Sequence, residues 1–214
     1  MPEPATPPCQ LYLLSPLDVS GEFPKRLERV IAAARGHVAA FQFRVKNLDA
    51  HEAARLAAPL QEICAAHDVA FIVNDSVSLA KRLKADGVHL GQSDGDPREA
   101  RRELGPDVQI GVTCHASRHL AMEAGEAGAN YVAFGSFYPS ETKVSEHRPD
   151  LEILTWWSRL FELPCVAIGG ITAGTATPLI QAGADFLAVS GGIWSGDETQ
   201  NASAFAGLLD RSSS

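Results

Sequence analysis

One short segment combines an amide and two cations at alternate positions: residues 42–46 read Gln-Phe-Arg-Val-Lys. Alternate residues of a β-strand point to the same face, so Gln42, Arg44 and Lys46 would share one face. A parallel strand is covered on both sides, and an unpaired buried cation is costly, so this face needs an anionic partner. We expect an anionic ligand there; pairing with nearby aspartates is the alternative.

Two aspartates follow the next two predicted strands. Asp75 comes after Asn74 at the end of one strand, and Asp94 follows a Gly-Gln-Ser turn after the next. Neighbouring carboxylates suit Mg²⁺ bound by one or two protein ligands, with phosphate oxygens and water completing the coordination. Aspartates after strands also serve as turn residues and helix caps. Because they lie beside the cations of residues 42–46, we expect them to form a site for Mg²⁺ and a diphosphate.

Further polar groups follow the later strands. Thr113 ends a predicted strand and could donate its hydroxyl to a phosphate, or bond locally to the backbone. The long polar loop over residues 136–150 contains Ser140, Thr142 and Lys143, which could close over phosphates. A plain surface loop is the alternative. His89, within a strand, is expected to be a hydrogen-bonded core residue.

Paired glycines follow the last two predicted strands, at 169–170 and at 191–192, the second pair directly after Ser190. In a closed α/β barrel these positions bind a phosphate through backbone N–H groups. The sequence therefore predicts two anion sites, one for a diphosphate and one for a monophosphate.

Short apolar strands alternate with helical stretches along the chain. The predicted strands are Leu11–Leu14, Val38–Val45, Val69–Asn74, Gly87–Leu90, Val108–Thr113, Tyr131–Gly135, Cys165–Gly169 and Phe186–Ser190. The predicted helices cover residues 24–35, 50–67, 76–84, 97–104, 116–127, 150–161, 173–182 and 201–210. This alternation predicts an α/β protein with a single-domain (β/α)8 TIM barrel, whose loops after the strands form the site. A doubly wound open sheet is disfavoured, because no Gly-x-Gly-x-x-Gly follows the first strand.

Composition narrows the possible partners. The chain has 214 residues and a net charge of −8, from 18 Lys and Arg against 26 Asp and Glu. Without a basic tract, neither nucleic acid nor an anionic membrane surface is expected as a partner. No apolar run approaches the roughly 20 residues that span a bilayer, and the Pro-rich start does not resemble a signal peptide, so we expect a soluble cytoplasmic protein.

The four cysteines have neither metal-binding nor disulfide spacing, so free thiols are expected. If the strand continues past Thr113, Cys114 and His115 point to opposite faces and cannot form a catalytic dyad. Residues 1–9 and 211–214 are expected to be flexible tails on a catalytic domain over residues 10–210.

Seven segments, in this order along the chain, resemble the thiamine phosphate synthase family. They are QFRVK (42–46), VND (73–75), DGVHLGQSD (86–94), GVT (111–113), YPSETK (138–143), VAIGGI (166–171) and GADFLAVS (183–190). The resemblance covers residues 10 to 210. It implies condensation of hydroxymethylpyrimidine diphosphate with a thiazole monophosphate, by Mg²⁺-assisted departure of diphosphate. It also implies small phosphorylated heterocycles as partners, and a homodimer.

The resemblance assigns a role to each candidate residue. The pyrimidine diphosphate would be bound by Gln42, Phe43, Arg44, Val45, Lys46, Asn74, Thr113 and Lys143. The thiazole phosphate would be bound by Ser140, Glu141, Thr142, Gly170, Val189 and Ser190. Asp75 and Asp94 would ligate Mg²⁺, and Lys143, Arg44 and Lys46 would be the catalytic residues.

The chain departs from the family pattern where Thr113 replaces a serine and where Gly191-Gly192 follow Ser190 in place of an alanine. The nearest alternative is the related thiazole tautomerase, which carries a histidine where this chain has Ser136 and typically lacks the two aspartates. A non-catalytic phosphate-binding barrel is a further alternative. A Schiff-base aldolase would need a lysine within a barrel strand, for which Lys46 is the candidate.

Overall fold

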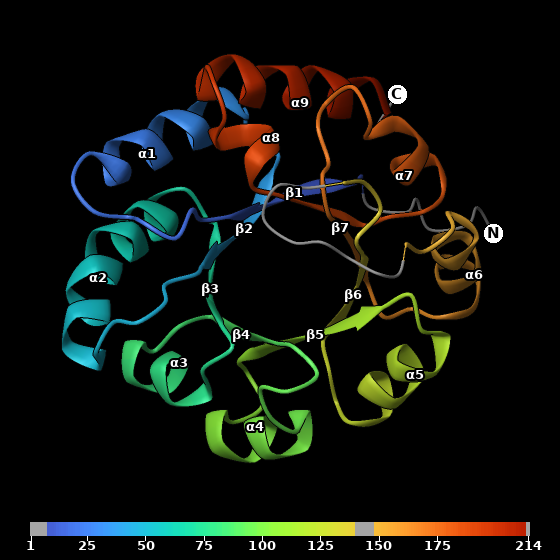
Figure 1. The fold of residues 1–214 in the computed structure, drawn as a ribbon, viewed down its shortest axis with the longest axis horizontal. Coiled ribbons are helices and arrows are strands. Elements are labelled where there is room, and N and C mark those ends of the chain that lie inside the picture. Colours follow the sequence, from blue (N-terminus) through green and yellow to red (C-terminus); the bar gives the residue numbers. More distant parts are fainter. Residues whose placement is uncertain (1–7, 140–147, 213–214) are drawn as a thin grey trace.

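The computed structural model describes residues 8–139 and 148–212. Eight parallel strands close into a barrel in chain order, surrounded by helices (Figure 1). The strands are β1 (Gln10–Leu14), β2 (Val38–Phe43), β3 (Ala70–Asn74), β4 (Gly87–Leu90), β5 (Gln109–His115), β6 (Tyr131–Gly135), β7 (Cys165–Ile168) and β8 (Phe186–Val189). The predicted TIM barrel is confirmed, and the open-sheet alternative is excluded by the pairing of β1 with β8.

The helices follow the strands in the expected alternation. They are α1 (Phe23–Ala33), α2 (Ala50–Ala66), α3 (Val77–Leu83), α4 (Pro97–Leu104), α5 (Arg118–Glu126), α6 (Glu152–Leu160), α7 (Thr177–Gln181), α8 (Gly191–Trp194) and α9 (Glu198–Ser212). The short helix α8 was not predicted from the sequence. Helix α9 begins three residues before its predicted start and continues to Ser212. At the other end of the described chain, Cys9 is already buried.

Strand alternation sorts apolar side chains into two cores. Those pointing outward pack under the helices, where the rings of Phe41 and Phe43 both lie against that of Phe71. Those pointing inward, among them Tyr12, Ile72 and Val166, fill the barrel. Each fully buried Phe or Leu side chain stabilises the fold by about 1.5–3 kcal/mol relative to an exposed one. The barrel is therefore a packed scaffold that holds the strand ends at its mouth in fixed positions.

Helices α3 and α4 are capped by residues other than the two aspartates that follow β3 and β4. Ser76 caps α3 by accepting a bond from the N–H of Leu79, and Asp96 caps α4 through the N–H of Arg98. The caps are therefore Ser76, which directly follows Asp75, and Asp96, which lies two residues after Asp94. The carboxylates of Asp75 and Asp94 are not needed for these caps.

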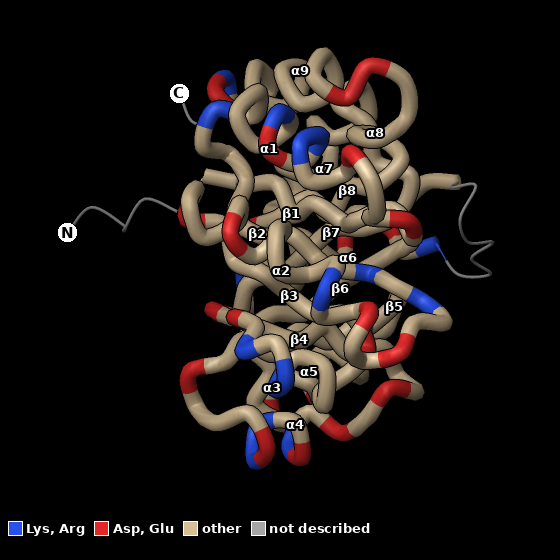
Figure 2. The backbone as a smooth tube through the Cα atoms, turned by 90° about the vertical axis from the view of Figure 1, so that its left-hand side faces the viewer, with Lys and Arg blue, Asp and Glu red and all other residues tan. Residues whose placement is uncertain are grey.

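Charged residues occupy the outer helices. Figure 2 shows basic and acidic residues mixed along α1 and α4. Several form ion pairs along one helix, such as Arg102 with Glu99 at 3.5 Å. Among the described residues, no helix is both long and apolar enough to cross a membrane.

Candidate active site at the barrel mouth

The two predicted metal ligands lie side by side where β3 and β4 end. The backbone of Asp75 is left-handed, with φ of +65°, and its N–H donates to the carbonyl of His89 at 2.8 Å. The side-chain amide of Asn74 donates to Asp75 Oδ2 at 2.5 Å. Asp94 Oδ2 accepts from the N–H of Gly91 at 2.9 Å. Left-handed backbone in a residue other than glycine is strained, and here it turns a carboxylate towards its neighbour.

The pKa of Asp75 reflects the groups around its carboxylate. Partial desolvation raises the pKa of Asp75, and the adjacent Asp94 raises it further, both by its charge and as a hydrogen-bond partner. Arg44 and the amide of Asn74 oppose this shift. Two neighbouring carboxylates repel each other unless a proton or a cation lies between them.

The donor set fits magnesium. Mg²⁺ is commonly bound by one or two carboxylates, and water and phosphate oxygens complete its coordination. The described residues contain no cluster of three or more His, Cys, Asp or Glu side chains that could hold a metal by themselves. Asp75 and Asp94 could therefore hold a divalent ion that a phosphorylated ligand helps to coordinate.

The cationic segment differs in part from its prediction. Strand β2 ends at Phe43 and not at Val45, so Arg44 and Lys46 follow the strand and the alternation rule does not extend to them. Arg44 is nevertheless anchored at the mouth, because its N–H donates to the buried hydroxyl of Ser15 at 2.9 Å. Its guanidinium lies near enough to lower the pKa of both Asp75 and His89. Lys46 is exposed two residues further on.

Phe43 and Val45 turn away from the barrel interior. Phe43 is buried beneath the helices, with its ring 5.6 Å from that of Phe71. Together with Val45 and Asp75, it borders a cleft of about 440 Å³ between the ends of β2 and β3 and the helices α2 and α3. The side chain of Phe43 therefore does not reach a ligand in the barrel mouth.

A chain of hydrogen bonds crosses the barrel interior just below the mouth. The amide Nε2 of Gln42 donates to the hydroxyl of Tyr12 at 3.0 Å, and the hydroxyls of Tyr12 and Tyr131 lie 2.8 Å apart. His89 Nδ1 lies 3.1 Å from the Tyr131 hydroxyl, and His89 Nε2 lies 2.8 Å from Thr113 Oγ1. The chain brings the predicted binding residues Gln42 and Thr113 into one network. His89 is the hydrogen-bonded core residue that was expected.

Burial determines the charge state of this network. His89 is only 6% exposed, and desolvation together with the nearby Arg44 lowers its pKa to about 4, so the imidazole is neutral near pH 7. Desolvation also raises the pKa of Tyr12 and Tyr131. The chain therefore consists of neutral groups, each of which can donate or accept.

Tyr12 and Tyr131 were missed by the sequence reasoning. A signal was present, because a tyrosine within a buried strand needs a partner for its hydroxyl. The ring of Tyr131 also requires Gly111 on the neighbouring strand β5, because a Cβ there would overlap the ring. Gln92 was missed as well; its amide donates to the carbonyl of Thr113 at 2.5 Å.

The predicted monophosphate site lies where the loops after β6, β7 and β8 meet. Gly170 has φ of +61°, and an added Cβ would fall within 3 Å of the backbone of Tyr138 and Pro139. Ser190 precedes helix α8, and its side chain makes no cap. The N–H groups of Ile193 and Trp194 bond to the Ser190 carbonyl, whereas those of Gly191 and Gly192 have no intrahelical acceptor. The side chain of Val189 is buried in the outer core and does not face the mouth. Ser140, Glu141, Thr142 and Lys143 lie outside the described residues.

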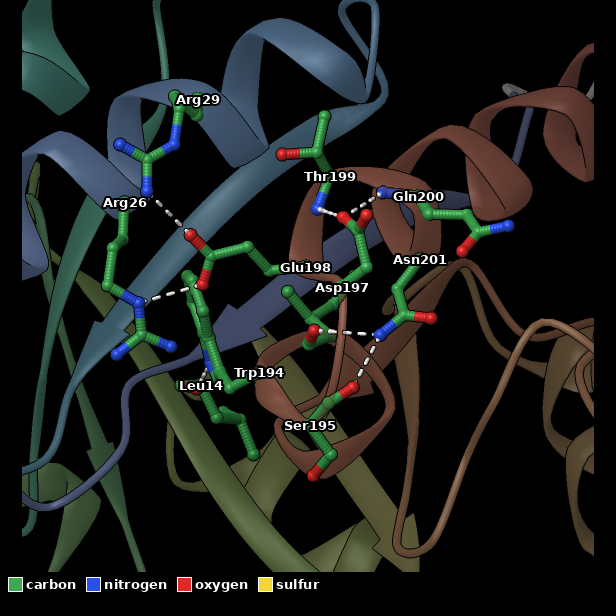
Figure 3. A network of polar contacts seen from close by, with 11 residues as sticks. Leu14, Arg26, Arg29, Trp194, Ser195, Asp197, Glu198, Thr199, Gln200 and Asn201 are labelled. Atoms are coloured by element: carbon green, nitrogen blue, oxygen red, sulfur yellow. Dashed lines mark hydrogen bonds and ion pairs between the residues drawn. The ribbon is translucent and has the colours of Figure 1, made fainter.

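Helix α8 is fixed from several sides (Figure 3). Its Trp194 Nε1 donates to the carbonyl of Leu14 at 2.7 Å, and Arg26 lies over the Trp194 ring. Asn201 Nδ2 donates to the carbonyls of Ile193 and Ser195 at the end of the helix. Figure 3 also shows Glu198 accepting from two arginines of α1, at 2.8 and 3.1 Å. These contacts hold the C-terminal end of α8 against β1, α1 and α9.

None of the four cysteines belongs to this site. All are buried free thiols, and desolvation raises the pKa of the Cys114 thiol to about 12. Cys114 is fully buried whereas His115 is exposed, so the two do not form a dyad.

Comparison with known proteins identifies the family of this chain. Residues 11–193 match the family model described as thiamine monophosphate synthase. The chain belongs to the thiamine monophosphate synthase family. A thiamine-phosphate synthase of Erythrobacter litoralis is 71% identical over 201 residues, which are 93% of this chain and 94% of the relative. Another from Rhodospirillum centenum is 53% identical over 87% of this chain and 89% of the relative.

A solved structure agrees with this placement. A thiamine phosphate pyrophosphorylase from Pyrococcus furiosus superimposes with a TM-score of 0.80 at 28% identity, covering 94% of this chain and 96% of that one. Membership of the thiamine monophosphate synthase family makes this chain a transferase of thiamine biosynthesis. The resemblance inferred from the seven segments is thereby confirmed, whereas the roles of individual residues stay predictions.

Proposed function

We propose that this chain joins hydroxymethylpyrimidine diphosphate to a thiazole monophosphate, giving thiamine monophosphate and free diphosphate, with Mg²⁺ bound by Asp75 and Asp94. The observation that carries this proposal is the adjacency of the two carboxylates beside Arg44 at the barrel mouth. The arrangement suits a diphosphate, which brings several negative oxygens to one place. When bound there, Mg²⁺ would neutralise charge that develops on the departing diphosphate.

The pyrimidine would enter the mouth above the buried polar chain. Gln42 and Asn74 offer amide groups that can pair with the amine and nitrogens of the ring. Thr113 is half-buried near the C-terminal end of β5 and offers a hydroxyl to the diphosphate. These neutral groups orient the substrate, since the charged groups lie further out beside the aspartates.

The reaction breaks the bond from the pyrimidine methylene carbon to the diphosphate oxygen, and the electron pair leaves with the diphosphate. The ring amine stabilises the cation that remains. The thiazole nitrogen then donates its electron pair to that carbon, forming the new C–N bond. Arg44, Lys46 and Lys143 would hold the departing diphosphate by preorganised positive charge, which stabilises the transition state without reorganisation.

No general base is required, because the aromatic thiazole nitrogen carries no proton to remove. The neutral His89 is consistent with this chemistry, since it is already engaged with Tyr131 and Thr113. What the site must do is hold the two substrates in line and exclude water, which would trap the cation.

The thiazole phosphate would lie against Gly170, Val189 and Ser190, at the start of α8. Backbone N–H groups at such a position bind phosphate without a charged side chain. Ser140, Glu141 and Thr142 would contact it from the loop after β6.

The decisive experiment incubates the protein with both heterocyclic phosphates, with and without Mg²⁺, and measures thiamine monophosphate and diphosphate. We expect equal amounts of both products, dependent on Mg²⁺. Binding of both substrates without any product would indicate a non-catalytic phosphate-binding barrel. Conversion of a thiazole phosphate tautomer without diphosphate release would indicate a tautomerase.

A further inference from the structure

The buried polar chain has a direction that follows from a single amide. Gln42 Nε2 can only donate, so the Tyr12 hydroxyl accepts from it. The proton of Tyr12 then has the Tyr131 oxygen, 2.8 Å away, as its partner. Tyr131, having accepted, donates its own proton to His89 Nδ1.

This sequence of donors fixes the histidine. A neutral imidazole that accepts at Nδ1 carries its proton on Nε2. His89 Nε2 therefore donates to Thr113 Oγ1, at 2.8 Å. Thr113 has then accepted a bond, and its own proton is free to turn towards the barrel mouth.

We propose that His89 is a positioning residue, held in the Nε2–H tautomer by the chain from Gln42 so that the Thr113 hydroxyl donates its proton to an anionic ligand oxygen. The proposal rests on the proposed function, which places a diphosphate beside Thr113. With every bond reversed, Thr113 would donate inward to His89 and would turn only its lone pairs to the anion. A phosphate oxygen needs a hydrogen-bond donor, so a bound phosphate favours the direction in which Thr113 donates towards the mouth.

The chain also couples the two ends of the substrate. With Nε2 committed to Tyr12, Gln42 presents its carbonyl oxygen as an acceptor, while Thr113 presents a donor. A ligand with an amine near Gln42 and a phosphate near Thr113 forms both hydrogen bonds with the same direction of the chain. A ligand with these groups exchanged would oppose the direction at both ends.

The direct test is the tautomer of His89 near neutral pH, read by ¹⁵N NMR of the histidine-labelled protein. The His89 signal is assigned by its loss in His89→Gln. We expect a single neutral tautomer with the proton on Nε2, and the same tautomer after inorganic diphosphate and Mg²⁺ are added. A proton on Nδ1 in the diphosphate complex would overturn the inference.

Binding of inorganic diphosphate in the presence of Mg²⁺, measured by calorimetry, tests the consequence for Thr113. Thr113→Val should weaken binding by about tenfold, whereas Thr113→Ser should restore it. Tyr131→Phe, which leaves Thr113 in place but interrupts the chain, should weaken binding by about threefold and give a mixture of His89 tautomers. Unchanged binding and an unchanged tautomer in Tyr131→Phe would contradict the proposed role of the chain.

The same measurements separate this inference from the proposed function. If the wild-type protein does not bind diphosphate, the proposed function fails and this inference fails with it. If the wild-type protein binds diphosphate while His89 carries its proton on Nδ1, only the inference fails.

Discussion

The carboxylate of Asp94 lies near enough to that of Asp75 to raise its pKa, although the two residues follow different strands, β3 and β4. Neither residue caps the helix that follows it, because Ser76 and Asp96 do so. Asp94 accepts from the N–H of Gly91 and Asp75 accepts from the amide of Asn74, but these bonds do not require the two like charges to face each other. Binding a cation between them, as proposed above, would relieve this repulsion.

Replacing either aspartate by asparagine removes one negative ligand while keeping its size. We expect Asp75→Asn and Asp94→Asn each to lower Mg²⁺-dependent diphosphate release by about 10²-fold or more, since the charge that stabilises the transition state is lost. Calorimetry should show weaker Mg²⁺ binding in both variants. Asp96→Asn is the matched control, because Asn caps a helix as well as Asp and this carboxylate serves only α4. Full activity in both site variants would exclude the metal site.

Lys143→Ala tests a residue outside the described part of the chain. If the lysine holds the departing diphosphate, turnover should fall by about 10²-fold or more. Lys81→Ala is a suitable control, because Lys81 is an exposed residue of α3 that pairs with Glu103 at 3.6 Å. Single-turnover rates equal to those of the wild type would remove Lys143 from the mechanism.

The fold was predictable because the alternation of strands and helices continues along the chain with its ordinary periods. The end of β2 and the presence of helix α8 were not predictable in this way. The polar and apolar residues of 42–46 alternate as in a strand, yet β2 makes its last pairing through Phe43 and Val73, and Arg44 bonds to Ser15 instead. Helix α8 has four residues and begins with two glycines, so it has no helical periodicity to detect.

The site was predictable where chemistry is concentrated in short segments, and less so where it depends on distant pairs. Asp75 and Asp94 follow β3 and β4, and Thr113 lies near the end of β5, which places them at one mouth by topology. Tyr12 and Tyr131, by contrast, are 119 residues apart in the sequence, and nothing local indicates that their hydroxyls meet. Such contacts follow from barrel closure, which brings opposite strands into one interior.

The pH dependence of stability should reveal the cap of α2. Asp49 accepts from the N–H groups of Glu52 and His51, which lowers the pKa of its carboxyl. A lowered pKa in the folded state means that ionised Asp49 stabilises the fold at neutral pH, and that this contribution is lost as the pH falls through the lowered value. Asp49→Ala should therefore lower the melting temperature near pH 7, by an amount that shrinks below about pH 4. Asp49→Asn keeps the cap and should melt near the wild type at neutral pH; a pH-independent effect of Asp49→Ala would contradict the assignment.

Gly170→Ala should separate the two halves of the proposed site. The residue has φ of +61°, and an added Cβ would fall within 3 Å of the backbone of Tyr138 and Pro139. Alanine is strained in this conformation and the contact is with backbone, so the loops after β6 and β7 must separate, at a cost of about 1–3 kcal/mol in the free energy of unfolding. We expect a lower melting temperature and a higher KM for the thiazole phosphate, with binding of diphosphate and Mg²⁺ unchanged, because Asp75 and Asp94 lie after β3 and β4.

Gly174→Ala in the same loop is the control, since its Cβ would meet only Thr172 Oγ1 at 3.8 Å. Equal KM values for both variants would mean that the thiazole phosphate does not use Gly170.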